Sequence, residues 1–259
     1  MSDLQDVVNT GHYARKQIHS RDPLIAWSHR RRFSTALTLA GQFAGQRVLD
    51  YGCGDGTFLG LLLQHPVRPA SAVGAEIHQH IVEDCQRRFA AYPMLQFVRT
   101  DDLRHPESRA TYDAIFCMEV FEHVVDPTPL IGELDRLLAP GGTLVVSVPI
   151  ETGLPVIVKQ LVRRVAGWRG IGHYPGTTGY TPIEFVKSVF AKSTQHILRP
   201  VFQDDERSFH DHKGFNWRVL RASLSARVDV VRTLTSPISW LGPQLSTQIW
   251  FIARKRGSR

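Results

Sequence analysis

The sequence predicts an α/β protein with a doubly wound, mostly parallel sheet, and three observations lead to this prediction. Short apolar runs of the length of a buried strand alternate with segments whose apolar residues recur at helical spacing. A glycine-rich turn follows the first apolar run, where such sheets bind nucleotide-like ligands. Regular alternation of strands and helices favours parallel pairing, because right-handed crossover helices join parallel strands.

The predicted elements succeed one another in the order that this fold requires. Strands are expected at residues 47–50, 70–76, 94–99, 112–118 and 142–149, and helices at 56–64, 79–92 and 130–138 between them. A mainly helical segment, residues 15–44, precedes the first strand. The alternation stops after residue 149 and resumes near the end of the chain, with a helix at 215–226 and strands at 227–234 and 247–255.

The interrupting segment has a composition of its own. It contains a basic amphipathic piece "LPVIVKQLVRRVAGW", a loop "GIGHYPGTTGYTP" and an acidic stretch "QDDERSFHDH". A helix is expected at 183–191, because Thr181 followed by Glu184 forms a capping box. The expected division is therefore an N-terminal helical lid (1–46), a core (47–150), an inserted α-helical cap (151–212) and the C-terminal part of the core (213–259).

Cysteine and histidine usage gives no sign of a metal site or a disulfide framework. Cys53, Cys85 and Cys117 lie in separate predicted elements and have no CxxC spacing, so packed thiols are expected. The run from His210 to His212 is too compact to hold an ion by itself, because adjacent side chains rarely converge on one metal. We therefore expect no metal.

Charge and hydropathy indicate a cytoplasmic protein. The net charge is +7, made of +4 in residues 1–47, −7 in 48–150 and +10 in 151–259. No apolar run reaches the length of a membrane span, and the N-terminus lacks the order of a signal peptide. The basic flanks either solvate the surface or face an anionic substrate, a membrane surface or nucleic acid.

The segment "RVLDYGCGDGTF" at residues 47–58 is the densest functional signal in the chain. Gly52, Gly54 and Gly56 follow a buried strand, and glycine lets a backbone turn tightly and approach a ligand closely. Glu76 ends the next strand, where a carboxylate accepts from ribose hydroxyls. The order is GxGxG and not the GxGxxG of nicotinamide enzymes, so a nicotinamide oxidoreductase is disfavoured.

The sequence resembles the class I S-adenosylmethionine (SAM)-dependent methyltransferases, and in particular their small-molecule O-methyltransferase branch. Five motifs over residues 47–149 carry the resemblance: "VLDYGCGDGTF", "VGAEI", "VRTDDL", "YDAIFCMEVFEHVVDP" and "LLAPGGTLVVSVP". The resemblance implies a Rossmann-like sheet of seven strands with a reversed last strand, and "STQIWFIARK" fits that strand. It also implies SAM as the cofactor.

The family pattern assigns cofactor roles to matching positions. Asp50 and the glycine loop would hold the methionine part, and Glu76 would bind the ribose diol. Asp102 would accept from the adenine amino group, although Asp101 competes for that role and a helix cap is the alternative reading. The full implied set is Asp50, Gly52, Cys53, Gly54, Glu76, Ile77, Asp101, Asp102, Leu103, Met118 and Glu119.

Methyl transfer to an oxygen requires removal of a proton, and His123 in "FEHV" is the candidate base, with packing at a helix start as the alternative. His173 in the insertion is a second catalytic candidate. Substrate contacts are expected from Tyr174, Tyr180, His212 and Lys213, with a structural lid or a solvated loop as the alternative. Tyr13, Arg15, Lys16 and Arg30–Arg32 either form an N-terminal lid over the cofactor or face outward from a packing helix.

The expected acceptor is a small metabolite, and an anionic, a lipid-linked and a sugar-linked metabolite are all among the expectations. The apolar pieces at 154–168 and 236–245 have basic neighbours, so they either contact a membrane peripherally or belong to an ordinary lid and a buried loop. An RNA methyltransferase is the first alternative, suggested by the pI of 9.6, but "CMEVFEH" lacks the signature used for base amino groups. A non-catalytic SAM-binding regulatory protein is the second.

Overall fold

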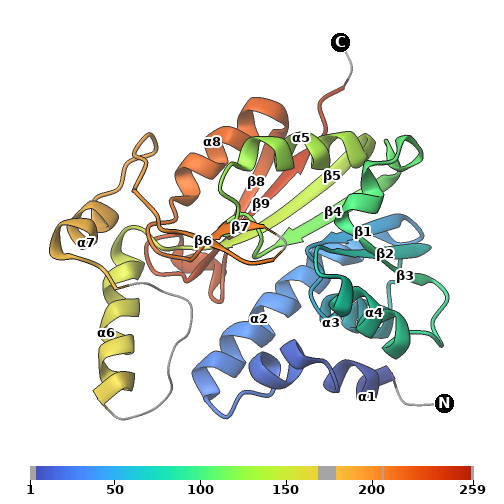
Figure 1. The fold of residues 1–259 in the computed structure, drawn as a ribbon, viewed down its shortest axis with the longest axis horizontal. Helices are drawn as coiled ribbons and strands as arrows, with labels where there is room; N and C mark the ends of the chain where they lie inside the picture. Colours follow the sequence, from blue (N-terminus) through green and yellow to red (C-terminus); the bar gives the residue numbers. More distant parts are fainter. Residues whose placement is uncertain (1–3, 169–178, 206, 258–259) are drawn as a thin grey trace.

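The computed structural model describes residues 4–168, 179–205 and 207–257 (Figure 1). Seven strands form one sheet in the order β3-β2-β1-β4-β5-β9-β8. All neighbours in it are parallel except β9, which runs antiparallel to both β5 and β8. This confirms the mostly parallel sheet with a reversed last strand. The strands are β1 (Arg47–Tyr51), β2 (Ser71–Glu76), β3 (Leu95–Arg99), β4 (Tyr112–Met118), β5 (Leu138–Pro149), β8 (Asp229–Ser236) and β9 (Gln248–Arg254).

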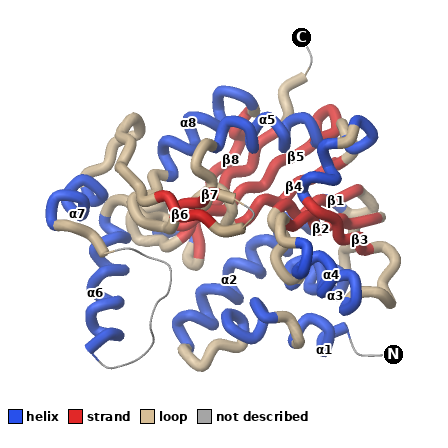
Figure 2. The backbone as a smooth tube through the Cα atoms, viewed as in Figure 1, coloured by secondary structure: helices blue, strands red, loops and turns tan. Residues whose placement is uncertain are grey.

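Helices cover both faces of the sheet (Figures 1 and 2). On one face α5 and α8 pack against each other and bury Leu134 and Leu224 completely. On the other face α2, α3 and α4 enclose a second apolar cluster that includes Leu59 and Phe116. The helices are α1 (Leu4–Asn9), α2 (Pro23–Ala40), α3 (Thr57–Gln64), α4 (Gln79–Arg88), α5 (Pro127–Leu137), α6 (Leu154–Trp168), α7 (Pro182–Val189) and α8 (Trp217–Arg227).

Because β1 pairs with β2 on one side and with β4 on the other, the strand order reverses at β1. The loops that follow β1 and β4 therefore diverge to opposite faces and leave a crevice at the carboxyl ends of these strands. Open α/β sheets bind their ligands at such a point.

Several element boundaries differ from the sequence prediction by two residues or more, among them both ends of β8 and the start of α8. Helix α5 begins at Pro127, before the predicted residue 130, because Asp126 accepts a hydrogen bond from the amide of Thr128 (2.9 Å) and caps the helix. Helix α4 ends at Arg88 instead of residue 92, and β5 starts at Leu138 instead of residue 142.

The insertion between β5 and α8 is not purely helical. It contains α6, α7 and a two-stranded hairpin of β6 (Val201–Gln203) and β7 (Ser208–His210), and β7 lies within the stretch that the sequence indicated only as acidic. Three-residue strands carry too little periodicity to be recognised before their pairing is known. The capping box was predicted correctly, since Thr181 and Glu184 cap α7 reciprocally. None of the described helices is long and apolar enough to cross a membrane.

Candidate active site

The glycine loop after β1 forms the floor of the crevice. The amides of Gly52 and Cys53 both donate to the carbonyl of Ala75 at the end of β2 (2.8 and 3.0 Å), which holds the loop against the sheet. Gly52 and Gly54 have φ angles of +77° and +53°. A Cβ at Gly52 would lie 2.4 Å from Cγ2 of Val120, whereas one at Gly54 would meet no atom within 4 Å and would stand in open space. The loop thus keeps its backbone accessible to a ligand.

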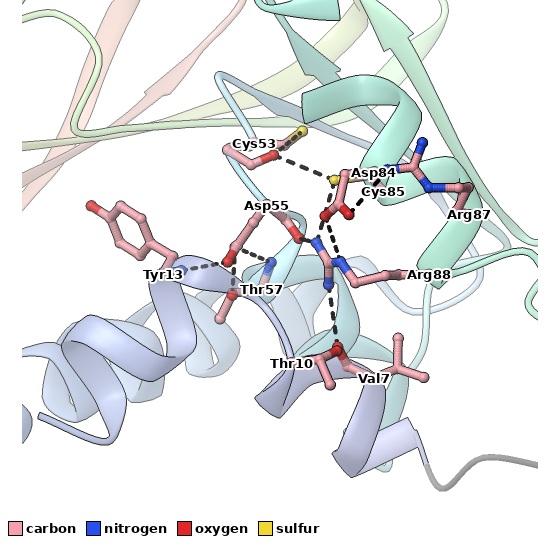
Figure 3. Close-up of polar contacts among 11 residues, drawn as sticks. Val7, Thr10, Tyr13, Cys53, Asp55, Thr57, Asp84, Cys85, Arg87 and Arg88 are labelled. Atoms are coloured by element: carbon pink, nitrogen blue, oxygen red, sulfur yellow. Dashed lines mark hydrogen bonds and ion pairs between the residues drawn. The ribbon is translucent and has the colours of Figure 1, made fainter. Parts of the chain in front are cut away.

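Asp55 joins this loop to the N-terminal segment (Figure 3). Its carboxylate accepts hydrogen bonds from the amide of Tyr13 (2.6 Å) and from the hydroxyl of Thr57 (2.6 Å). The guanidinium of Arg88 on α4 donates to the carbonyls of Asp55 and Val7. The N-terminal helices are therefore fastened to the loop that they cover.

Glu76 lies at the end of β2 with its carboxylate turned toward the same loop. One oxygen accepts from the amide of Gly54 (3.1 Å), and the other accepts from the amide of Ile77 (2.8 Å) and lies 3.1 Å from Nδ1 of His78. These contacts fix a nearly buried carboxylate at the position where the sequence predicts ribose binding.

Asp50 is almost completely buried at the end of β1. Burial, together with the carboxylates of Glu76 and Asp55, raises the pKa of Asp50 to about 8. A cation bound beside this group would favour its ionised form. The site is therefore suited to a ligand that carries positive charge.

Two adjoining cavities occupy the crevice, and Gly52 and Glu119 line both of them. The smaller, of about 130 Å³, is bordered by the glycine loop and by the N-terminal segment. The larger, of about 260 Å³, extends past the ends of β2 and β4. Nine of the predicted cofactor-binding and catalytic residues border one or both cavities: Asp50, Gly52, Cys53, Gly54, Glu76, Ile77, Met118, Glu119 and His123.

Arg32 on α2 closes the smaller cavity from the N-terminal side. Its guanidinium lies 3.5 Å from the carboxylate of Glu119 and over the ring of Tyr13. Only 6% of Arg32 is exposed; burial by itself lowers the pKa of the guanidinium, but the nearby Tyr13 and Glu119 outweigh this and raise it. This geometry agrees with an N-terminal lid for Tyr13 and Arg32, whereas Arg30 bonds to the carbonyl of Ile18 within the lid.

Glu119 is held in a left-handed backbone conformation with φ +56°, which is uncommon for a residue other than glycine. Its other carboxylate oxygen accepts from Oγ of Ser147 (3.2 Å) and from Nε2 of Gln248 (2.7 Å). These bonds from β5 and β9 aim the side chain into the crevice. Backbone strain of this kind gathers at functional sites.

His123 lines the larger cavity on the turn that follows β4. Its Nδ1 lies 2.9 Å from the carbonyl of His210 and must donate to it, so Nε2 carries the lone pair. Burial lowers the pKa of His123, which makes the neutral form dominant at pH 7. Nε2 is 3.9 Å from a carboxylate oxygen of Glu122, and the ring packs edge-on against His212 at 4.9 Å between centroids.

Thr100, Arg207 and Glu122 are among the residues of this region that were not singled out from the sequence. Thr100 and Arg207 line the larger cavity, and Nε of Arg207 is buried with no hydrogen-bond partner among the described residues. Glu122 is fully buried, and burial raises its pKa well above the usual range. A charged residue within the apolar turn "EVFEHV" was the only available signal for Glu122.

The remaining predicted residues lie outside both cavities. Asp102 caps the turn after β3 by accepting from the amide of Arg99, Asp101 pairs with Arg99 and Arg104, and Leu103 belongs to the core. In the insertion, the hydroxyl of Tyr180 accepts from the amide of Gly214, and Lys213 pairs with Glu184 on α7 (2.9 Å). His173 and Tyr174 lie outside the described residues.

Comparisons with known proteins define the class of this site. Residues 26–219 match the family described as Methyltransferase domain. A ubiquinone biosynthesis O-methyltransferase of Xanthomonas oryzae pv. oryzae is 33% identical over 197 residues, which are 72% of this chain and 74% of that protein. An uncharacterized 37.1 kDa protein of transposon TN4556 from Streptomyces fradiae is also 33% identical, but the match spans 45% of this chain and 34% of that one.

A solved structure has the same fold. The N-methyltransferase NodS of Bradyrhizobium japonicum, in complex with S-adenosylhomocysteine (SAH), superposes with a TM-score of 0.55 at 16% identity, and the match covers 97% of this chain and 96% of that one.

The chain belongs to the methyltransferase-domain family and is a SAM-dependent methyltransferase. The residues of the crevice fit the cofactor. Buried Asp50 suits the cationic methionine end, the open position at Gly54 accommodates close approach, and Glu76 stands beside the larger cavity for the ribose. SAM supplies an activated methyl group, and the protein aligns an acceptor with it and excludes water.

Proposed function

We propose that the enzyme transfers the methyl group to an oxygen of a small acceptor that has an apolar portion and carries negative charge. The observation that carries this proposal is His123, which borders the same cavity as Glu76 and Glu119 and keeps a lone pair on Nε2 because Nδ1 donates to the carbonyl of His210. An acceptor hydroxyl must lose its proton as the methyl group arrives, and a lone pair at this place can assist directly or by holding a cation.

The surroundings of His123 support the proposed acceptor chemistry. Arg207 offers a guanidinium to an anionic group in the same cavity. Val124 lines both this cavity and a third cavity, of about 750 Å³, between the turn after β4 and α8. This third cavity presents apolar side chains, including Phe121, Ile197 and Phe215, and could hold a lipid-like substituent.

The relative from Xanthomonas oryzae adds a second line of support, because its name states that it methylates an oxygen in ubiquinone biosynthesis. Its chemistry agrees with a hydroxylated acceptor here. The acceptor class remains our proposal for this chain.

The proposal is tested by transfer of labelled methyl from SAM to a panel of hydroxylated aromatic acids, with and without an apolar chain, and to amine analogues. We expect labelling of the hydroxyl compounds. His123→Asn should lower kcat by about a hundredfold or more while SAH binding is unchanged. The exposed His105→Asn serves as the control. Preferred labelling of amines, or full activity of His123→Asn, would contradict the proposal.

A further inference from the structure

The turn after β4 and the end of the β6–β7 hairpin bring three potential metal ligands together. Ligand atoms of Glu122, His123 and His212 all lie within 4.8 Å of one another. The first two follow β4, whereas His212 belongs to the insertion, so only the folded chain brings them together.

Glu122 provides an independent sign that this cluster binds a ligand. The side chain is 0% exposed, and neither carboxylate oxygen has a hydrogen-bond partner among the described residues. A buried carboxylate without a partner is costly, and buried charges are normally paired or coordinate metals. The distance from Oε1 of Glu122 to Nε2 of His123, another potential metal ligand, is 3.9 Å, which is too long for a hydrogen bond.

His123 is oriented as metal-ligating histidines usually are. Such residues donate their second ring nitrogen to a carbonyl or carboxylate, which fixes the ring and leaves the first nitrogen free to coordinate. Nδ1 of His123 donates to the carbonyl of His210 (2.9 Å), so Nε2 keeps its lone pair and lies 3.9 Å from a carboxylate oxygen of Glu122.

The backbone around the cluster is tied together from both sides. The amide of His210 donates to the carbonyl of His123 (3.0 Å), which completes a reciprocal pair with the Nδ1 contact. The guanidinium of Arg199 donates to the carbonyls of Glu122 and Asp211, one from each segment. These contacts hold the ligands near one another before an ion arrives, which limits the cost of organising the site.

We propose that Glu122, His123 and His212 form a binding site for a divalent transition-metal ion, most suited to Zn²⁺. Two imidazoles and one carboxylate are a ligand set of catalytic zinc sites, which keep a further position open. Bonds of about 2.1 Å place ligand atoms about 3.4 Å apart in a tetrahedral site, so a contraction of at most about 1.4 Å from the present separations suffices.

The open position gives the site a role that rests on the proposed function. His123 borders the cavity that also touches Glu76 and Glu119, so an ion there would meet the acceptor hydroxyl. The ion would lower the pKa of that hydroxyl, whose proton passes to water. The oxygen–methyl bond then forms as the sulfur–methyl bond of SAM breaks, and SAH leaves. His123 acts in this scheme as a ligand and not as the base.

The test is calorimetric titration of the full, chelator-treated chain with Zn²⁺, with Mg²⁺ as the oxygen-preferring comparison. We expect one Zn²⁺ per chain at micromolar affinity or tighter and much weaker Mg²⁺ binding. His212→Ala and Glu122→Gln should each weaken Zn²⁺ binding by about tenfold or more, and His105→Ala should not. Co²⁺ should show visible absorption bands that these two variants alter.

SAH titration of the same proteins separates the two proposals. All variants should bind SAH as the unaltered chain does, which also shows that they fold. Because Glu122 is fully buried, His212→Ala at a half-buried position is the deciding variant. Equal Zn²⁺ affinity in His212→Ala and the unaltered chain would overturn the metal site. Methyl transfer that survives chelation would overturn its catalytic role and leave the proposed function standing.

Discussion

At the scale of single residues, the cofactor site combines groups that the sequence identifies with groups that it does not. The glycine loop, Asp50 and Glu76 lie within one local pattern, and the structure brings them to the same crevice. Asp102 belongs to the same pattern, but it is the third residue of the short helix after β3, and its carboxylate accepts from the amide of Arg99, which holds the N-cap position. Thr100, two residues before Asp102, borders the larger cavity of the crevice, whereas Asp102 does not.

The raised pKa of Asp50 predicts a pH-dependent affinity for SAM. Below about pH 8 the free site holds a protonated Asp50, and binding of the cationic cofactor has to release that proton. The affinity should therefore rise with pH, by an amount approaching tenfold per unit, between pH 5.5 and 7.5, where the amino group of SAM stays charged. Calorimetric titration across this range measures the slope.

Asp50→Asn provides the matched control for this dependence. It should bind SAM at least tenfold more weakly at pH 7.5 and with little pH dependence. The free variant should also be more stable than the unaltered chain near pH 8. A carboxyl whose pKa is raised on folding loses stability as the pH rises from its unfolded value toward about 8, and asparagine lacks this loss. A steep pH dependence that persists in Asp50→Asn would assign it to another group.

At the scale of secondary structure, the core elements follow from local patterns, and the insertion does so only in part. Strands β1 to β4 were predicted to within about one residue, because each is a short apolar run bounded by turn residues. Helix α7 was identified by its capping box. The hairpin was missed, because its strands exist only through their pairing with each other.

Helix α7 depends on Glu184 for its attachment as well as for its cap. The ammonium of Lys213 and the amide of Thr181 lower the pKa of Glu184 to about 2. A lowered pKa stabilises the folded form above the usual value near 4.5 and loses this effect as the pH falls toward 2. Glu184→Gln should therefore speed hydrogen exchange of the α7 amides severalfold at pH 7, measured by mass spectrometry.

Lowering the pH of the unaltered chain from 5 to 3 should loosen α7 in the same way, after correction for the intrinsic exchange rate. Lys187→Gln on the same helix is the matched control, since Lys187 is exposed. If Glu184→Gln exchanged no faster than this control, the ion pair would not hold the helix in place.

At the scale of the whole molecule, α6 and α7 contact each other at one side of the sheet (Figure 1). Leu154, Ile157, Val158 and Leu161 recur at helical spacing on α6, and each is more than 40% exposed. Trp240, in the apolar segment after β8, is also exposed, so that segment is not the buried loop given as an alternative. Residues 151–259 carry a net charge of +10.

We propose that this apolar face of α6 contacts a membrane surface peripherally. The protein should cosediment with vesicles of anionic lipid, less so at high salt and little with neutral vesicles. Replacing Val158 and Leu161 by serine should lower the bound fraction severalfold. Val231→Ser, an exposed apolar residue on β8, should not. Equal binding by both variants would remove α6 from the contact.

Local sequence patterns were sufficient to predict the order of the core elements, the glycine loop and the carboxylates expected at a SAM site. These features lie within one strand–turn–helix unit or recur at a fixed position of the fold, so local pattern suffices. The tertiary structure alone decided that Arg32 meets Glu119 and that His212 meets Glu122 and His123. These residues are far apart in the chain, and they meet only because the N-terminal helices and the insertion fold back over the carboxyl ends of the strands.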